Sequence, residues 1–422
     1  MDERATNPWR RWLMLVVLCL GGGTIFFLPF LRWTYYIPMK EALSLTNTQF
    51  GVLMSTYGIA ATIFYFPGGW IADRISPRKL LTFSFAATGA AGLYLATYPS
   101  YAMCIVLQIF WGLTTTLTFW SALIKATRDM AKSSEQGKFF GLLEGGRGIT
   151  STVVSMAVLA MFARLGAGVY GLTWVIIAYS FISIAVGLVT WFVFEDPKEI
   201  IKTGAVFDDV VKVLKMPKAW LIAIIIFSNY FVLSGQTYLT PYITEVFGAT
   251  VALSALLSLI RLYGLQIPFG PLGGIVADKT GSPTRVTVYC FAIMTVCMGI
   301  FLIIPGTPSL LMLMVLNMVV MGVGIYSMRG VYFAIIDEVK ITPALTGATV
   351  GFVSMIGFTP DIFIYPLGGF LMDKYPGVLG YKIFFSFMTA VVAIGLVVAI
   401  VLYKMVKEQN KMQKDVETVL AT

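Results

Sequence analysis

The chain has 422 residues, of which 58% are hydrophobic and only 12% are charged, and its mean hydropathy is +0.84. Soluble globular domains are about one-quarter charged, so this composition excludes a soluble protein and predicts an integral membrane protein. Histidine is absent, which removes Ser-His-Asp nucleophile systems and imidazole metal sites. We therefore expect no enzyme activity, no cofactor and no metal site.

Twelve apolar stretches, each bounded by charged residues, proline or glycine, predict transmembrane helices in chain order. About 20 apolar residues span a bilayer, and the stretches lie at 12–36, 48–72, 79–98, 101–127, 137–164, 170–194, 219–246, 251–277, 284–305, 308–335, 345–372 and 380–403. The fold class is therefore all-α, with six-helix bundles at 1–194 and 219–403. A cytoplasmic loop at 195–218 separates the bundles, and a cytoplasmic tail follows at 404–422.

Basic residues set the predicted orientation. Most of the 30 Lys and Arg residues fall in the loops that share a side with the N-terminus. Because cytoplasmic loops carry an excess of Lys and Arg, both termini are predicted to be cytoplasmic, in a multi-pass protein of the cell (inner) membrane. The same bias explains the net charge of +9 without a nucleic-acid partner.

A short pattern, Gly-Gly-x-x-x-Asp followed by a cation, occurs three times. The copies are Gly68 to Arg74, Gly273 to Lys279 and Gly368 to Lys374. Glycine allows close helix packing in a membrane. The first two copies end spans two and eight on the cytoplasmic side, and the third ends span eleven on the outside. Three-helix inverted repeats nested in two parallel halves predict this arrangement.

With these motifs the chain resembles the major facilitator superfamily over its whole length. The signature loop between spans two and three contains Gly69-x-x-x-Asp73-Arg74 with Arg78 and Lys79, and Asp278-Lys279 is a weaker copy. The resemblance implies 3+3 inverted repeats and secondary transport by alternating access. It also implies gating roles for four loop residues, which are Asp73, Arg74, Arg78 and Asp278.

Two further features favour one branch of that family. Ser76-Pro77 stands in the signature loop, as in the organophosphate:phosphate antiporters and related sugar-phosphate permeases, and Gln108 stands where proton-coupled drug antiporters have arginine. In span one, the resemblance places a phosphate-holding arginine at Arg32. It places Arg147 where that family has a functional histidine, whereas span seven has no second arginine, and Arg261 is the candidate to replace it.

Six ionisable residues lie well inside the predicted spans, which is costly in a bilayer and marks functional sites. They are Arg32, Arg147, Arg261, Arg329, Glu144 and Asp361. Counted along straight helices, Arg32 and Arg261 share a layer, and Arg147 and Arg329 lie nearer the cytoplasm. The cationic surplus favours an anion, because guanidinium grips phosphate, sulfonate or carboxylate through two parallel hydrogen bonds. Tyr36 and Gln236 are further candidate substrate contacts.

The sequence therefore predicts a secondary transporter for a small organic anion, a phosphorylated or sulfonated sugar-like compound, which functions as a monomer with phosphate or a proton as possible counter-ion. An alternative is a proton-coupled symporter of an organic acid, with Asp361 or Glu144 carrying the proton. Glu144 stands three residues from Arg147, which favours an ion pair and makes it the poorer proton carrier. A transporter-like membrane receptor is the remaining alternative, although the short loop and tail offer little output surface.

Overall fold

A computed structural model describes residues 8–72, 74–130, 136–195, 212–341 and 343–421. By contacts, the chain divides into two compact units. Unit 1 comprises Met1–Gly204 with Gly248–Gly264, and unit 2 comprises Ala205–Phe247 with Leu265–Thr422. This division differs from the two predicted bundles over Gly248–Gly264, because the helices of that segment pack against a helix of unit 1. Most of the central loop predicted at 195–218 lies outside the described residues.

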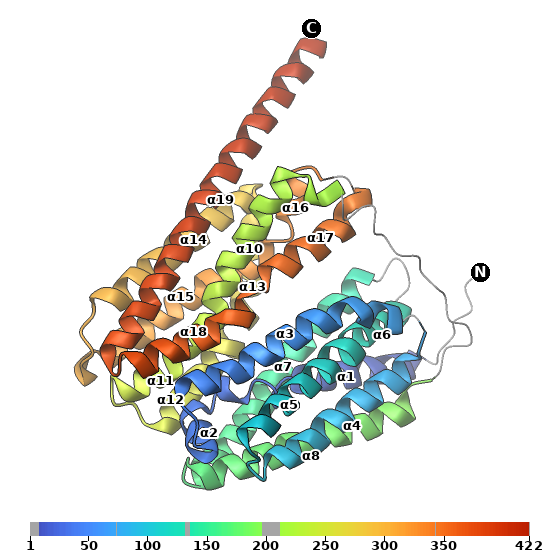
Figure 1. Cartoon of the computed structure of the whole chain (residues 1–422). Coiled ribbons are helices and arrows are strands. Elements are labelled where there is room, and N and C mark those ends of the chain that lie inside the picture. Colours follow the sequence, from blue (N-terminus) through green and yellow to red (C-terminus); the bar gives the residue numbers. More distant parts are fainter. Residues whose placement is uncertain (1–7, 73, 131–135, 196–211, 342, 422) are drawn as a thin grey trace. The chain divides into compact units, whose positions relative to one another are not determined.

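Unit 1 is built entirely from helical segments within its described residues. They are α1 Pro8–Thr24, η1 Leu31–Trp33, α2 Tyr36–Leu43, α3 Asn47–Ala72, α4 Pro77–Leu95, α5 Tyr101–Gly112, η2 Leu113–Trp120, α6 Ser121–Met130, α7 Gln136–Arg164, α8 Val169–Val193, α12 Val251–Leu259 and η5 Ile260–Gly264. Helices α4 and α8 pack side by side, as do α1 and α7 (Figure 1). Two segments, η2 and η5, are π-helical, a rare conformation that is frequent at functional sites.

Unit 2 has the same all-helical character over the residues that are described. Its elements are α10 Pro217–Gly235, η4 Gln236–Tyr238, α11 Leu239–Glu245, α13 Gln266–Thr280, α14 Pro283–Ile303, η6 Pro308–Leu310, α15 Leu311–Val331, α16 Ile335–Glu338, α17 Pro343–Gly357, α18 Pro360–Lys374 and α19 Val378–Ala421. Helix α19 continues past the predicted end of its span at 403 and extends beyond the other helices of the unit in Figure 1.

The helices confirm the predicted membrane fold. Every one of the twelve predicted stretches contains helix, and nine segments of the described chain are long and apolar enough to cross a membrane. Large apolar side chains point outward from the helices, among them Phe192, Ile63 and Val153, which are at least 60% exposed. In water this exposure would be unfavourable, whereas lipid is the appropriate solvent for it.

The first predicted span is wrong as a single straight helix. The prediction runs from 12 to 36, but α1 ends at Thr24, and Arg32 lies in the short 3-10 turn η1. Three consecutive glycines, Gly21 to Gly23, lower helix propensity at this end, and Pro29 cannot continue the ladder of hydrogen bonds. Depth counted along a straight helix therefore does not apply to Arg32.

The break in span one has a counterpart in span seven. Each consists of a 3-10 turn followed by a short helix, and each contains the pattern Thr-Tyr-x-x-Pro, at 34–38 and 237–241. Both prolines occupy the third position of the short helix, α2 or α11. The first four N–H groups of a helix have no partner within it, so proline is tolerated there and favours a new helix start.

Candidate functional site

Arg32 is held at the break in span one by aromatic rings and a backbone carbonyl. Its side chain is only 2% exposed, and its Nη1 donates a hydrogen bond to the carbonyl of Phe50 at 3.0 Å. The guanidinium lies 4.7 Å from the ring centre of Phe50 and 5.1 Å from that of Tyr36. The Tyr36 hydroxyl in turn donates to Asn47 at 2.8 Å. These contacts orient a permanent positive charge in the interior of unit 1.

Arg261 belongs to the same unit as Arg32. It lies in the π-helical segment η5 and is also 2% exposed. Two residues further on, the ring of Tyr263 packs against Phe27 of the α1–η1 turn at 5.9 Å between ring centres. Both rings line a small cavity with Tyr35 and Tyr179. The structure thus brings the two predicted anion-binding arginines into one unit, and their binding role stays a prediction.

Arg147 supports the broken end of α1. Its Nε donates to the carbonyl of Gly22 at 3.1 Å, and Ser151, one turn further along α7, donates to Gly23 at 2.8 Å. The last carbonyls of a helix lack partners within it, and a cation near them is favoured by the helix dipole. A Cβ on Gly22 would lie 2.9 Å from Arg147 Cδ, so the glycine allows this approach. The Glu144 side chain lies outside the described residues, so the predicted ion pair is untested.

Asp361 lies in a cluster of hydroxyl groups in unit 2. Ser234 Oγ donates to its Oδ1 at 2.5 Å, and the Tyr365 hydroxyl donates to the same oxygen at 3.1 Å. The Tyr230 hydroxyl donates to Oδ2 at 2.9 Å. The predicted span at 345–372 is interrupted here: α18 begins at Pro360, so Asp361 falls in the first turn of a helix, where negative charge is favoured.

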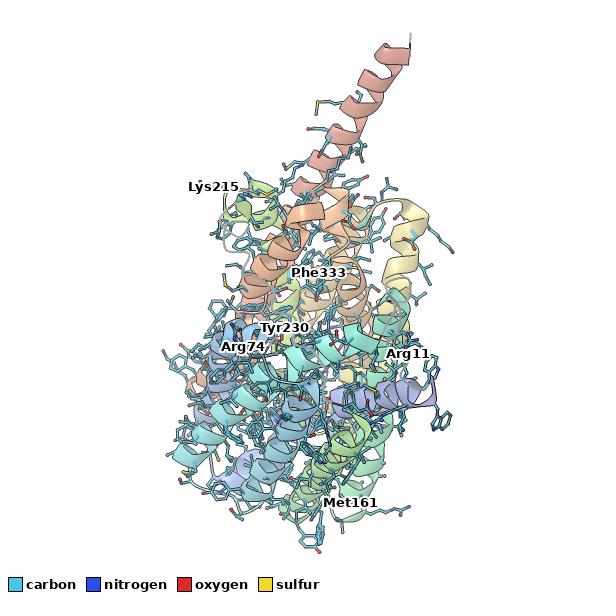
Figure 2. The ribbon with its side chains drawn as sticks, turned by 90° about the vertical axis from the view of Figure 1, so that its right-hand side faces the viewer. Arg11, Arg74, Met161, Lys215, Tyr230 and Phe333 are labelled. Carbon is cyan, nitrogen blue, oxygen red and sulfur yellow. The ribbon has the colours of Figure 1, made fainter. Side chains whose placement is uncertain are left out.

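The sequence analysis missed the three hydroxyl partners of Asp361. A signal was present, because Asp361 and Tyr365 are four residues apart, as are Tyr230 and Ser234, and such pairs share a helix face. Figure 2 labels Tyr230, which lies on α10, and Lys215, which lies in the turn just before that helix. Tyr230 lies about 20 Å from the beginning of α10 at 1.5 Å per residue, which places it well inside the bilayer.

Arg329 lies within a group of tyrosines in unit 2. Tyr326 stands three residues before it on α15, and Tyr332, at the C-cap of that helix, stands three residues after it. The ring centre of Tyr326 lies 6.0 Å from the guanidinium carbon. No ion pair links Arg329 and Asp361 among the residues that the structure describes.

Gln236 occupies the break in span seven and is completely buried in η4. Within the described chain, neither its Oε1 nor its Nε2 has a hydrogen-bond partner. Burying an amide without a partner is costly. A substrate that hydrogen-bonds to the amide would remove this cost, which is a structural reason to keep Gln236 as a candidate substrate contact.

The structure describes the predicted gating residues only in part. Asp73 lies outside the described residues, Arg74 is exposed in the turn that follows α3, and Asp278 is exposed near the end of α13. Arg78 Nε donates to the carbonyl of Trp191 at 2.8 Å, and its guanidinium stacks 4.1 Å from the ring centre of that tryptophan. Arg78 therefore joins α4 to the end of α8. The gating roles themselves remain predictions.

Comparison with known proteins gives consistent results. Residues 12–358 match the Major Facilitator Superfamily. Inner membrane protein YihN of Escherichia coli strain K12 is 35% identical over 410 residues, covering 95% of this chain and 97% of YihN. The hexuronate transporter of Bacillus subtilis strain 168 is 20% identical over 367 residues, covering 80% of this chain and 82% of that protein.

Solved structures show the same fold. A bacterial homologue of the human lysosomal transporter Spinster, in an inward-facing and unoccupied conformation, has a TM-score of 0.74 at 15% sequence identity. The alignment covers 96% of this chain and 98% of that one. At this identity the likeness concerns the fold.

Proposed function

The chain belongs to the Major Facilitator Superfamily of transporters, and we propose that its cargo is a small, sugar-like organic anion moved by alternating access. It is a multi-pass membrane protein and a transporter, as the sequence predicted, and not an enzyme. We further propose an inner-membrane location with both termini in the cytoplasm. The name of YihN as an inner membrane protein and the distribution of basic residues support this location.

The observation that carries the anion proposal is the buried guanidinium of Arg32. A charged side chain inside the bilayer is expensive, and such residues mark substrate or ion pathways. Phe50 and Tyr36 hold the group in one orientation by ring contacts and a backbone hydrogen bond, which preorganises the planar guanidinium for an oxyanion. Arg261, buried in the same unit, is the second proposed contact.

The head group of the cargo is a phosphate, sulfonate or carboxylate. The resemblance of the signature loop to sugar-phosphate permeases supports a phosphorylated cargo, and the likeness to a hexuronate transporter supports a carboxylated one. Both are hydroxylated sugar derivatives with one anionic head. Gln236, with its buried amide, is the proposed hydrogen-bonding partner of cargo hydroxyl groups.

Uptake into proteoliposomes tests this proposal directly. The panel contains a hexose phosphate, a hexuronate, a hydroxyalkyl sulfonate and, as the neutral control, the parent hexose. We expect saturable uptake of at least one anion and none of the hexose above protein-free vesicles. Uptake of the hexose with rejection of all three anions would contradict an anion carrier.

A further inference from the structure

A groove on the surface of unit 2 runs between α14 and α15, which pack against each other (Figure 1). Its volume is about 440 Å³, which lies within the roughly 300–1,000 Å³ of ordinary ligand sites. Val296 and Leu316 are 63% and 58% exposed, so the groove opens away from the protein and, in a membrane, toward lipid. Aliphatic side chains from both helices form most of its lining, among them Ala292, Val296, Ile300, Leu313, Leu316 and Val320.

The walls of this α14–α15 groove suit a hydrocarbon ligand. The sequence has no Asp, Glu, Lys or Arg between Arg285 and Arg329, a stretch that covers both walls and the turn that joins them. Asn317 also lines the groove, but its Nδ2 donates to the carbonyl of Cys297 on the facing helix at 3.0 Å. A polar ligand would lose hydrogen bonds to water here and gain few in return, and an apolar cavity does not retain water.

The length of the groove matches one leaflet of a bilayer. Along α14 the lining runs from Ala292 to Ile300, about 12 Å at 1.5 Å per residue, and it lies toward the turn at 304–310. A hydrocarbon core of about 30 Å gives each leaflet about 15 Å. A transmembrane helix of a second copy would contact both leaflets, and 12 Å of a helix about 10 Å wide occupies roughly 900 Å³. The groove therefore fits a lipid chain better than a helix.

Shape is what can retain a chain at this place. Lipid is as apolar as the groove, so the hydrophobic effect does not distinguish them, and the number of van der Waals contacts decides. A chain between two helices contacts carbon atoms on both sides, whereas a chain on a single convex helix contacts them on one. Each contact is weak but their sum is large, and an unfilled groove would lose all of them.

We propose that the α14–α15 groove binds one acyl chain of a membrane phospholipid, in the leaflet next to the 304–310 turn, as a structural part of unit 2. The site is separate from the proposed anion site and does not depend on it. Because the groove is uncharged, the chain is recognised and the charge of the head group is not. The turn offers a head group only the exposed hydroxyls of Thr307 and Ser309.

Photochemical labelling of the reconstituted wild-type protein tests the site. The probe is phosphatidylethanolamine with a diazirine in the middle of one acyl chain, and adducts are mapped by mass spectrometry. Peptides of α14 and α15 should have at least about fivefold more label per exposed apolar side chain than those of α8, because the groove provides more contacts. Helix α8 is the reference because it exposes Phe181, Leu188 and Phe192. Equal label density on all three helices would overturn the proposal.

The same probe chain on phosphatidylglycerol tests what is recognised. It should label the same peptides to the same extent. A clear preference for either phospholipid would show that the head group is recognised, and labelling by a diazirine fatty acid but by neither phospholipid would identify a different ligand. Both results contradict the proposal.

A matched pair of variants tests the groove itself. Val296→Trp fills the groove, so the label on α14 and α15 should fall to the density found on α8. Val153→Trp places the same ring at a position of α7 that is 62% exposed, against 63% for Val296, and should leave the labelling unchanged. Full labelling of Val296→Trp, or cross-linking of the groove to a second copy of the chain in place of lipid, would refute the proposal. The wild-type map is decisive even if Val296→Trp folds poorly.

Discussion

Spans one and seven break in the same way but contain different chemistry. Both have a 3-10 turn, a short helix and the pattern Thr-Tyr-x-x-Pro, at 34–38 and 237–241. In this register, Arg32 of the first break corresponds to Gly235 of the second. The repeated pattern therefore accompanies the same local backbone. A single difference two residues before the pattern places a buried cation in one unit and none at the matching position of the other.

The two breaks are also supported differently. At the first, Arg147 and Ser151 of α7 donate to the last carbonyls of α1, and glycines allow the close approach. At the second, α10 continues directly into η4, and Gln236 is buried without a hydrogen-bond partner among the described residues. The first break is held by cations and backbone contacts, and the second contains a polar side chain available to a ligand.

The largest expected effect comes from removing the cation of the first break. Arg32→Lys keeps the charge but loses the fork of parallel hydrogen bonds, so anion affinity should fall by roughly 1.5 to 3 kcal/mol. Arg32→Gln should lose more. Ligand-induced thermal shifts of both variants measure the loss, because a ligand that binds only the folded protein raises its stability.

The matched control for Arg32 is Arg285→Gln in unit 2. Arg285 is also an arginine beside a tyrosine ring, 5.6 Å from the centre of Tyr403, but it lies at the start of α14. We expect its ligand shift to equal that of the wild type. Equal shifts in the wild type and both Arg32 variants would remove Arg32 from the anion site.

The next largest effect is a loss of stability when the glycines of the two breaks are replaced by alanine. A Cβ on Gly23 would lie 2.7 Å from the backbone oxygen of Arg147, which cannot move away. A Cβ on Gly235 would meet only the flexible ends of Ile364 and Met388, at 2.9 Å. Gly23→Ala should therefore destabilise the protein by about 1 to 3 kcal/mol and Gly235→Ala by less.

Thermal unfolding in detergent measures this difference. Gly145→Ala is the control on α7, because nothing lies within 4 Å of a Cβ there. Its effect should be neutral or stabilising, since alanine has the higher helix propensity. A greater loss of stability for Gly235→Ala than for Gly23→Ala would mean that the second break is the more tightly packed.

Replacing Gln236 should have smaller effects, which are opposite in sign for protein stability and for ligand affinity. Replacing a buried amide that has no partner by leucine should raise the stability of the empty protein by about 1 kcal/mol. If the amide binds cargo, Gln236→Leu should also weaken affinity about tenfold, which is the loss of roughly one hydrogen bond. Thermal shifts without and with ligand measure both quantities. Greater stability with unchanged affinity would assign Gln236 no role in binding.

The smallest expected effect concerns the two tyrosines of the repeated pattern. The Tyr238 hydroxyl donates to the carbonyl of Tyr365, whereas the Tyr35 hydroxyl is buried without a hydrogen-bond partner among the described residues. Tyr238→Phe should therefore lower the unfolding free energy by about 1 kcal/mol, and Tyr35→Phe should leave it unchanged or raise it slightly. A fall in the unfolding temperature as large for Tyr35→Phe as for Tyr238→Phe would contradict this difference between the breaks.

The candidate site was predictable only in part. Arg32, Arg261 and Asp361 stand out in the sequence because ionisable residues inside apolar stretches are rare and costly. Their partners do not stand out, because a tyrosine or serine in a span usually has a packing or interfacial role. Tyr230 became recognisable only when α10 and α18 were seen to bring its hydroxyl to Asp361.

The sequence by itself determined the membrane class, the positions of the helices and the family, because these depend on apolar length, on loop charge and on short local motifs. The break of span one was also encoded locally, in three glycines and Pro29. Only the tertiary structure decided that Arg147 supports the broken end of α1 and that three hydroxyls surround Asp361. The physical reason is that these contacts join helices far apart in the chain, and helical periodicity says which residues share a face but not which helix that face meets.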